Sequence, residues 1–127
     1  MGYLWVALGG ALGSVARYAC AALGVRLFGA TFPWSTLFVN VSGSLAIGLL
    51  AALATADAKP LVTGDSRAFL MIGVLGGFTT FSSFSLETLN LARGGQWGAA
   101  GANVAVSMVL CLVGVWLGYL AGGALNR

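Results

Sequence analysis

The chain has 127 residues, of which 59% are hydrophobic and only 7% are charged, and its mean hydropathy is +0.96. Soluble domains carry about 25% charged residues, so this composition predicts one integral, multi-pass domain of the cell membrane. The net charge of +3 is spread without a basic run, which gives no sign of nucleic-acid binding. Histidine is absent from the sequence, so no nucleophile–base pair can be assembled and we expect no enzyme.

Four stretches are long and apolar enough to be membrane helices, each of which needs roughly 20 such residues. They cover residues 3–27, 33–56, 67–91 and 96–125. Between them, residues 56–67 form the one clearly polar loop and residues 93–96 a short turn. Such short connections predict an all-α bundle in which successive helices run in opposite directions.

Glycines one helical turn apart mark the first and last of these spans. Gly9 and Gly13 form one pair, and Gly114, Gly118 and Gly122 form a longer run. Small faces of this kind let helix backbones approach closely in lipid. We therefore expect helix packing to be their main role.

The third span contains Gly76 and Gly77 near its middle, followed by Phe78, Thr79 and Thr80. Glycine costs about 1 kcal/mol against alanine in a helix, and either threonine can cap a new helix start. The pattern therefore predicts a helix broken into halves over residues 67–75 and 80–91. The free carbonyls ending the first half suit a cation, and the free amides opening the second suit an anion. The alternative is a pair of glycines packed against a neighbouring helix with no break.

The residues after the predicted break place hydroxyls and aromatic rings on one helix. Its spacing brings together on one face Phe81, Phe84, Ser85 and Thr88, with Ser82 and Ser83 to the sides. A row of hydroxyls can take the place of water around a permeant species, and the positive edge of a phenylalanine ring can face an anion. Core packing is the alternative role for the two rings.

Two other spans carry polar stripes at membrane depth. Thr36 and Asn40 lie one turn apart on the second span, and Asn103, Ser107 and Cys111 follow one another by single turns on the fourth. Polar groups inside a membrane are functional candidates. Hydrogen bonding between helices is the alternative interpretation.

The charged residues of the spans favour an anion over a cation as the permeant species. Arg17 is expected at the wet end of the first helix, where it could draw anions into a vestibule. Glu87 is the only acid in any span, and its position predicts that it points away from the phenylalanine face. No candidate lining residue near the middle is acidic.

Four segments together resemble one family of membrane proteins. GGALGSVARY (9–18), TLFVNVSGS (36–44), GGFTTFSSFSLE (76–87) and NVAVSMVLCLVGVWLG (103–118) are similar to the Fluc, or CrcB, family of fluoride channels. The similarity covers all four spans in order. It implies a dual-topology antiparallel homodimer with two fluoride pores, which passively exports fluoride and lowers its toxicity in the cytoplasm. It also implies a central structural Na⁺ at the broken third helix that does not permeate.

The same resemblance assigns roles to individual positions. Gly76 and Thr79 would give backbone carbonyls to Na⁺ from both subunits. The residues implied along the fluoride path are Asn40, Thr36, Phe81, Phe84, Ser82, Ser83, Ser85, Asn103 and Ser107. Arg17 matches the arginine near the vestibule. Cys111 stands where the family has a small or hydroxylated residue.

Two other classes of protein are weighed against a channel. A small multidrug-type proton-coupled exporter also uses four short helices, but it requires a membrane carboxylate, and the first span holds no Asp or Glu. A structural subunit of a larger membrane complex would leave the hydroxyl–phenylalanine run and the mid-membrane Asn40 unexplained. The channel is therefore the predicted function.

Overall fold

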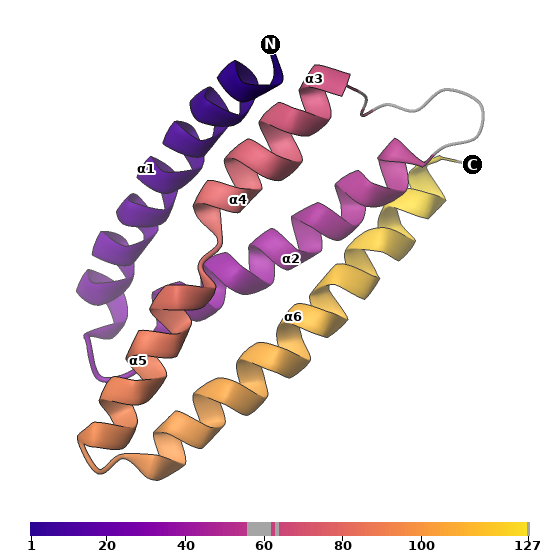
Figure 1. Cartoon of the computed structure of the whole chain (residues 1–127). Coiled ribbons are helices and arrows are strands. Elements are labelled where there is room, and N and C mark those ends of the chain that lie inside the picture. The colour runs from indigo at the N-terminus through magenta and orange to yellow at the C-terminus, as the bar shows by residue number, and fades with distance from the viewer. Residues whose placement is uncertain (56–61, 63, 127) are drawn as a thin grey trace.

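A computed structural model describes residues 1–55, 62 and 64–126 (Figure 1). In this described part the elements are α1 (Gly2–Phe28), α2 (Trp34–Ala54), α3 (Gly64–Arg67), the π-helical segment η1 (Ala68–Val74), α4 (Leu75–Phe78), α5 (Phe81–Arg93) and α6 (Trp97–Leu125). Most of the predicted polar loop, including Lys59, lies outside the described residues, and so does Arg127.

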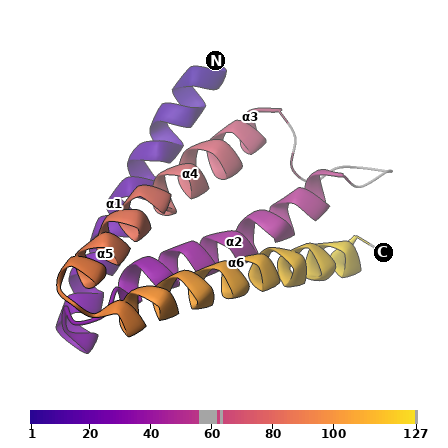
Figure 2. The same cartoon turned by 60° about the horizontal axis from the view of Figure 1, so that its bottom comes forward.

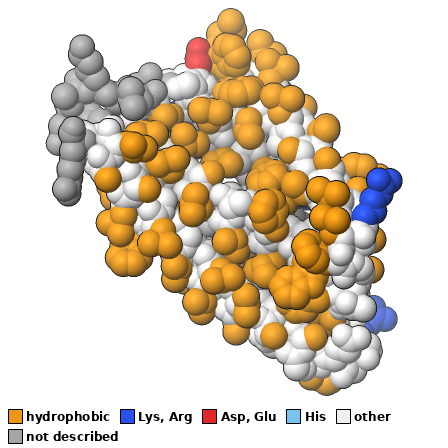
Figure 3. All heavy atoms as spheres, turned by 180° about the vertical axis from the view of Figure 1, so that it is seen from behind, with side chains coloured by type: hydrophobic (Ala, Val, Ile, Leu, Met, Phe, Trp, Pro, Cys, Tyr) orange, Lys and Arg blue, Asp and Glu red, His pale blue; other side chains and the backbone are white. Residues whose placement is uncertain are grey.

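Four helices are long and apolar enough to cross a membrane, which confirms the predicted all-helical, four-span class. They are α1, α2, the stretch Gly64–Arg93 that contains α3 to α5, and α6. Large apolar side chains are exposed along them, as at Leu12, Leu112 and Trp116. Figure 3 shows apolar atoms spread over one whole face, with basic side chains at one edge and acidic atoms at one end. A surface of this kind suits lipid, and the chain is a multi-pass membrane protein.

The helices form two pairs that spread apart. α2 packs against α6, while α1 packs against η1 and α4. The pairs meet at the end that carries the α1–α2 and α5–α6 connections and diverge toward the end that carries both termini (Figure 2). The first part of the third helix, η1 and α4, contacts α1. Its last part, α5, contacts α6 and α2 of the other pair.

Glycines hold the members of each pair at close range, as their spacing predicts. A methyl group at Gly118 would collide with the carbonyl oxygen of Leu45 on α2, and one at Gly13 with that of Val74 on η1. Gly9 similarly faces the backbone of Phe69. The confirmed role of these positions is therefore backbone-to-backbone packing.

The prediction of a third helix broken at its glycines is not confirmed. Gly76 and Gly77 lie inside α4, and the axis of the third helix bends by only 13°. The interruption lies two residues later, where Thr79 (φ −83°, ψ 155°) and Thr80 (φ −153°, ψ 112°) are extended. A methyl group at Gly77 would meet the carbonyl oxygen of Gly10 on α1, so this glycine serves close packing.

Candidate functional site: a polar groove at the helix interruption

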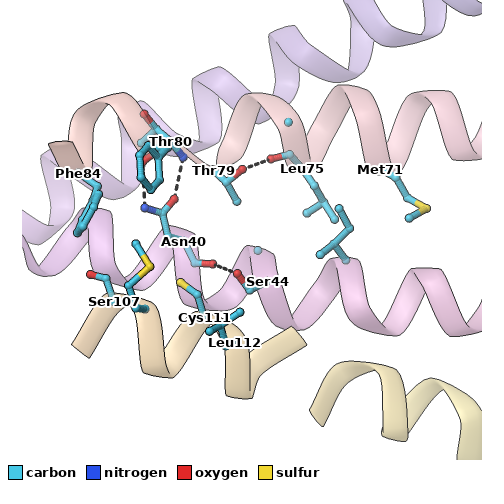
Figure 4. Close-up of a pocket in the computed structure, with 15 residues that line it drawn as sticks. Asn40, Ser44, Met71, Leu75, Thr79, Thr80, Phe84, Ser107, Cys111 and Leu112 are labelled. Atoms are coloured by element: carbon cyan, nitrogen blue, oxygen red, sulfur yellow. Dashed lines mark hydrogen bonds between the residues drawn. The ribbon is translucent and has the colours of Figure 1, made fainter. Parts of the chain in front are cut away.

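A groove of about 360 Å³ lies beside the interruption, between α2, α6 and the third helix. Its polar lining consists of Asn40, Ser44, Thr79, Thr80 and Ser107, and its aromatic lining of Phe81 and Phe84 (Figure 4). No Asp or Glu lines it. The structure thus gathers residues from four separate segments around one weakly polar, uncharged space.

Asn40 forms the central contact of the groove. Its Nδ2 donates to the carbonyl oxygen of Thr80 at 3.0 Å, and its Oδ1 accepts from the Thr80 backbone N–H at 2.7 Å (Figure 4). In a continuous helix that N–H would donate to the carbonyl of Gly76. One amide side chain therefore satisfies both backbone groups of an extended residue. Nδ2 carries a second hydrogen, so the amide retains capacity to donate to a ligand.

Thr80 also caps α5. Its Oγ1 accepts from the backbone N–H of Ser83 at 3.2 Å and donates to the Ser83 Oγ at 3.1 Å. The Ser82 Oγ lies 3.3 Å from the same oxygen. The sequence predicted that Thr79 or Thr80 would cap a new helix, and Thr80 is the residue that does so. Ser82 and Ser83 thus lie together at the positive end of α5.

Phe81 and Phe84 form the aromatic part of the site. Their ring centroids are 5.3 Å apart and their planes are inclined by 47°. Phe84 is buried, with 6% of its surface exposed, whereas 69% of Phe81 is exposed. Phe84 is therefore packed within one chain, whereas the described residues leave most of the Phe81 surface uncovered.

Asn103 joins α6 to α5, and Ser107 bonds to Asn103 within α6. The Asn103 Nδ2 donates to Thr88 Oγ1 at 2.9 Å, and Thr88 Oγ1 donates to the carbonyl of Phe84 at 2.8 Å. Ser107 Oγ donates to Asn103 Oδ1 at 3.4 Å. Asn103 is 1% exposed and does not line the groove, whereas Ser107 is buried and does. Hydrogen bonding between helices was the alternative interpretation of the polar residues on the fourth span, and Asn103 makes such a bond.

Thr36 and Glu87 form a second polar link between α2 and α5. Thr36 Oγ1 donates to Glu87 Oε1 at 2.8 Å. Both residues line another cavity of about 410 Å³ beside the α1–α2 connection, together with Asn90 and Gln96. The sequence did not predict this pairing. It leaves Thr36 one turn before Asn40 and bonded to Glu87.

The remaining predicted residues lie at different distances from the groove. Ser85 donates to the carbonyl of Phe81 at 2.9 Å on an exposed face of α5. Cys111 lines the groove one turn beyond Ser107. Arg17 is half-buried on α1, and its Nε has no hydrogen-bond partner among the described residues. Arg17 does not line the groove.

Gly76 and Thr79 border the groove at the end of α4. The last carbonyls of a helix have no intrahelical donor. A side chain added at Gly76 would meet nothing within 4 Å, so its backbone is approachable from outside. The described residues contain no cluster of His, Cys, Asp or Glu able to hold a metal. Any cation here would be bound by backbone oxygen.

Sequence reasoning missed two residues of this site, Thr80 as the partner of Asn40 and Thr88 as the partner of Asn103. A signal for the second was available. Thr88 falls on the phenylalanine face one turn after Phe84, where a hydroxyl inside lipid needs a partner. For Thr80 the sequence held no comparable signal, because its bonds are made by backbone atoms.

The fold and the groove define a class of protein: a multi-pass membrane protein with an uncharged, hydroxyl-, amide- and phenylalanine-lined site at a helix interruption. The family model described as "CrcB-like protein, Camphor Resistance (CrcB)" matches residues 4–119, and the chain belongs to this family.

Curated relatives extend over nearly the whole chain. A protein of Opitutus terrae is 60% identical over 98% of this chain and 94% of its own length. A protein of Rhodospirillum rubrum is 52% identical over 100% of this chain and 98% of its own length. A protein of Thermus thermophilus is 54% identical over 97% of this chain and 96% of its own length. Each is named "Fluoride-specific ion channel FluC". These relatives are ion channels by name and not enzymes.

Proposed function

We propose that this chain is a fluoride-specific ion channel through which fluoride leaves the cell passively. The observation that carries the proposal is the groove: amide and hydroxyl side chains and two phenylalanines line it, and no carboxylate is present to repel an anion. Relatives that are 60% and 52% identical carry the name of such a channel. The family resemblance and the geometry thus favour the same function.

The fluoride path follows the neutral donors of the groove. The Asn40 amide, the Phe81 and Phe84 ring edges and the hydroxyl of Ser107 replace the water of a small, strongly hydrated anion. Ser82, Ser83 and Ser85 extend the hydroxyl track along α5, with Thr36 and Asn103 beside it. Arg17 attracts anions to the entrance. Larger anions hold water less tightly and fit a narrow path less well, which favours fluoride over chloride.

Export through such a path needs no coupling to an energy source. Fluoride enters cells as neutral HF from acidic surroundings and ionises inside. An anion pore then lets it leave down its gradient, helped by an inside-negative membrane potential. The result is a lower fluoride concentration in the cytoplasm.

A second copy of the chain, in the opposite orientation, completes the site. Support comes from the exposed Phe81 and from the helix pairs, which spread apart toward one end (Figure 2). Two copies give two such paths. The carbonyls of Gly76 and Thr79 from both copies hold one structural Na⁺, and a monovalent ion fits because no acid lines the groove.

Liposomes containing the purified protein test the function. Fluoride efflux should be fast and chloride efflux should be near the protein-free background when the two are measured in matched vesicles. Replacing Na⁺ by a large organic cation during purification and assay should reduce the fluoride rate. Equal rates for fluoride and chloride would refute the specific channel.

A further inference from the structure

We infer that Asn40 is a positioning residue that fixes the interruption of the third helix by acting as the hydrogen-bond partner of the Thr80 backbone. Its Oδ1 replaces, at 2.7 Å, the acceptor that the Thr80 N–H loses where the helix is interrupted, and its Nδ2 donates to the Thr80 carbonyl at 3.0 Å. Thr80 is 8% exposed, so water does not freely replace these bonds. An unpaired backbone N–H inside a membrane would cost several kcal/mol, and the Asn40 Oδ1 prevents that cost.

The approach of α2 to the interruption is built into its sequence. Gly43 lies three residues after Asn40 on α2, and a methyl group at Gly43 would collide with Thr79 Cγ2. The missing side chain lets the α2 backbone come close enough for Asn40 to reach Thr80. Ser44 Oγ donates to the Asn40 carbonyl at 2.7 Å on the same turn. Gly43 and Asn40 therefore act together: one sets the distance and the other makes the bonds.

We call the two hydrogen bonds between Asn40 and Thr80 the Asn40 bridge. It lies between two groups of functional candidates. Thr79, which precedes Thr80, belongs to the proposed cation site, and Phe81, which follows it, belongs to the aromatic pair. α5 has few apolar anchors of its own, since Phe84 is its one buried residue. Hydrogen bonds at Thr80, Glu87 and Thr88 take their place. The Asn40 bridge thus ties the carbonyls of one site to the rings of the other, a link to ion flow that rests on the proposed function.

Hydrogen–deuterium exchange of the Thr80 amide tests the bridge directly in the full-length protein in lipid nanodiscs. Asn40→Leu keeps the side-chain bulk but has no donor or acceptor. It should make Thr80 exchange about tenfold faster or more, while amides of α1 and α6 keep their protection. Gly43→Ala should give the same local effect with Asn40 intact. Wild-type protection of Thr80 in both variants would overturn the inference.

Asn40→Asp supplies a test within one folded protein. At neutral pH an ionised carboxylate accepts from the Thr80 N–H but cannot donate to the Thr80 carbonyl. At acid pH the protonated carboxyl again has one donor and one acceptor, like the amide. Because both forms accept from the Thr80 N–H, this amide should keep much of its protection at either pH, unlike in Asn40→Leu. Loss of Thr80 protection in Asn40→Asp to the level of Asn40→Leu at both pH values would overturn the inference.

Thr36→Val is the matched control on the same face of α2. It removes the bond to Glu87 and leaves the Asn40 bridge, so Thr80 should stay protected. A specific role for Asn40 would be overturned if Thr36→Val instead lowered Thr80 protection as much as Asn40→Leu does. Loss of any α2–α5 contact would then expose the Thr80 amide. Fluoride efflux of the wild-type preparation is measured alongside. Its absence would refute the proposed function but leave the exchange result on the bridge standing.

Discussion

At the scale of single residues, the two phenylalanines of the groove differ in what they contribute to one chain. Phe84 is buried and Phe81 is exposed, although their ring centroids lie only 5.3 Å apart. If both rings face fluoride, their loss should affect transport equally and stability unequally. Substitution by isoleucine removes the ring edge and keeps much of the bulk.

We predict that Phe81→Ile and Phe84→Ile each lower fluoride efflux from liposomes by about tenfold or more, the equivalent of about 1.4 kcal/mol. Only Phe84→Ile should also lower the thermal unfolding midpoint, because it alters buried packing by about 1 kcal/mol. Wild-type efflux in both variants, with a lower midpoint for Phe84→Ile, would assign the pair to packing.

A substitution at Gly76 can distinguish contacts within one chain from contacts with a second copy. A methyl group there meets nothing within 4 Å, and alanine favours a helix by about 1 kcal/mol over glycine. Gly76→Ala should therefore leave the fold of each chain intact, yet crowd the backbone where a second copy and a cation are proposed. We predict weaker Na⁺ dependence and a smaller dimer fraction in native mass spectrometry.

The control for this variant is Gly98→Ala, at an equally open position in the first turn of α6. It should dimerise and respond to Na⁺ as the wild type does. If Gly76→Ala were indistinguishable from this control in dimer fraction, Na⁺ dependence and efflux, the cation site would not be at Gly76.

At the scale of elements, the seam between α2 and α6 depends on glycine. Gly118→Ala puts a methyl group against the Leu45 carbonyl, with further backbone atoms 2.9 and 3.0 Å away. Because neither backbone can yield locally, the helices must separate, at a cost of about 1–3 kcal/mol. We predict a lower thermal midpoint by several degrees. Gly123→Ala, on the same helix but with open space around it, should keep or slightly raise the midpoint.

The helices themselves were predictable, and the interruption was not placed correctly. Long apolar stretches and one-turn glycine spacing are local properties, so the four spans and their close faces follow from the sequence. The interruption was expected at Gly76 and Gly77 because glycine is a poor helix former. In the structure Gly77 instead packs against α1, and Asn40 from another helix satisfies Thr80. That compensation depends on the register between helices, which no local pattern contains.

At the scale of the whole molecule, charge does not favour one orientation in the membrane. Both termini lie at one end, and the α1–α2 and α5–α6 connections lie at the other (Figure 1). Arg67 lies at the first end, and in the sequence Lys59 belongs to the connection between α2 and α3 and Arg127 follows α6. The second carries Arg26 and Arg93, with Arg17 deeper in α1. Orientation follows the Lys and Arg bias near the span ends, and here the two ends nearly balance.

We therefore predict that the chain inserts both ways and is active only as an opposed pair. Lysines added to the polar loop between α2 and α3 should fix one orientation and abolish fluoride efflux, because parallel copies would place like half-helix ends on the same side and would not form the opposed site that we propose. Lysines added at residues 93–96 should fix the other orientation with the same result. Co-expression of the two variants should restore efflux, and cysteine accessibility from each side of the membrane should show opposite orientations. Full activity from either biased variant alone, with its single orientation verified, would contradict the antiparallel pair.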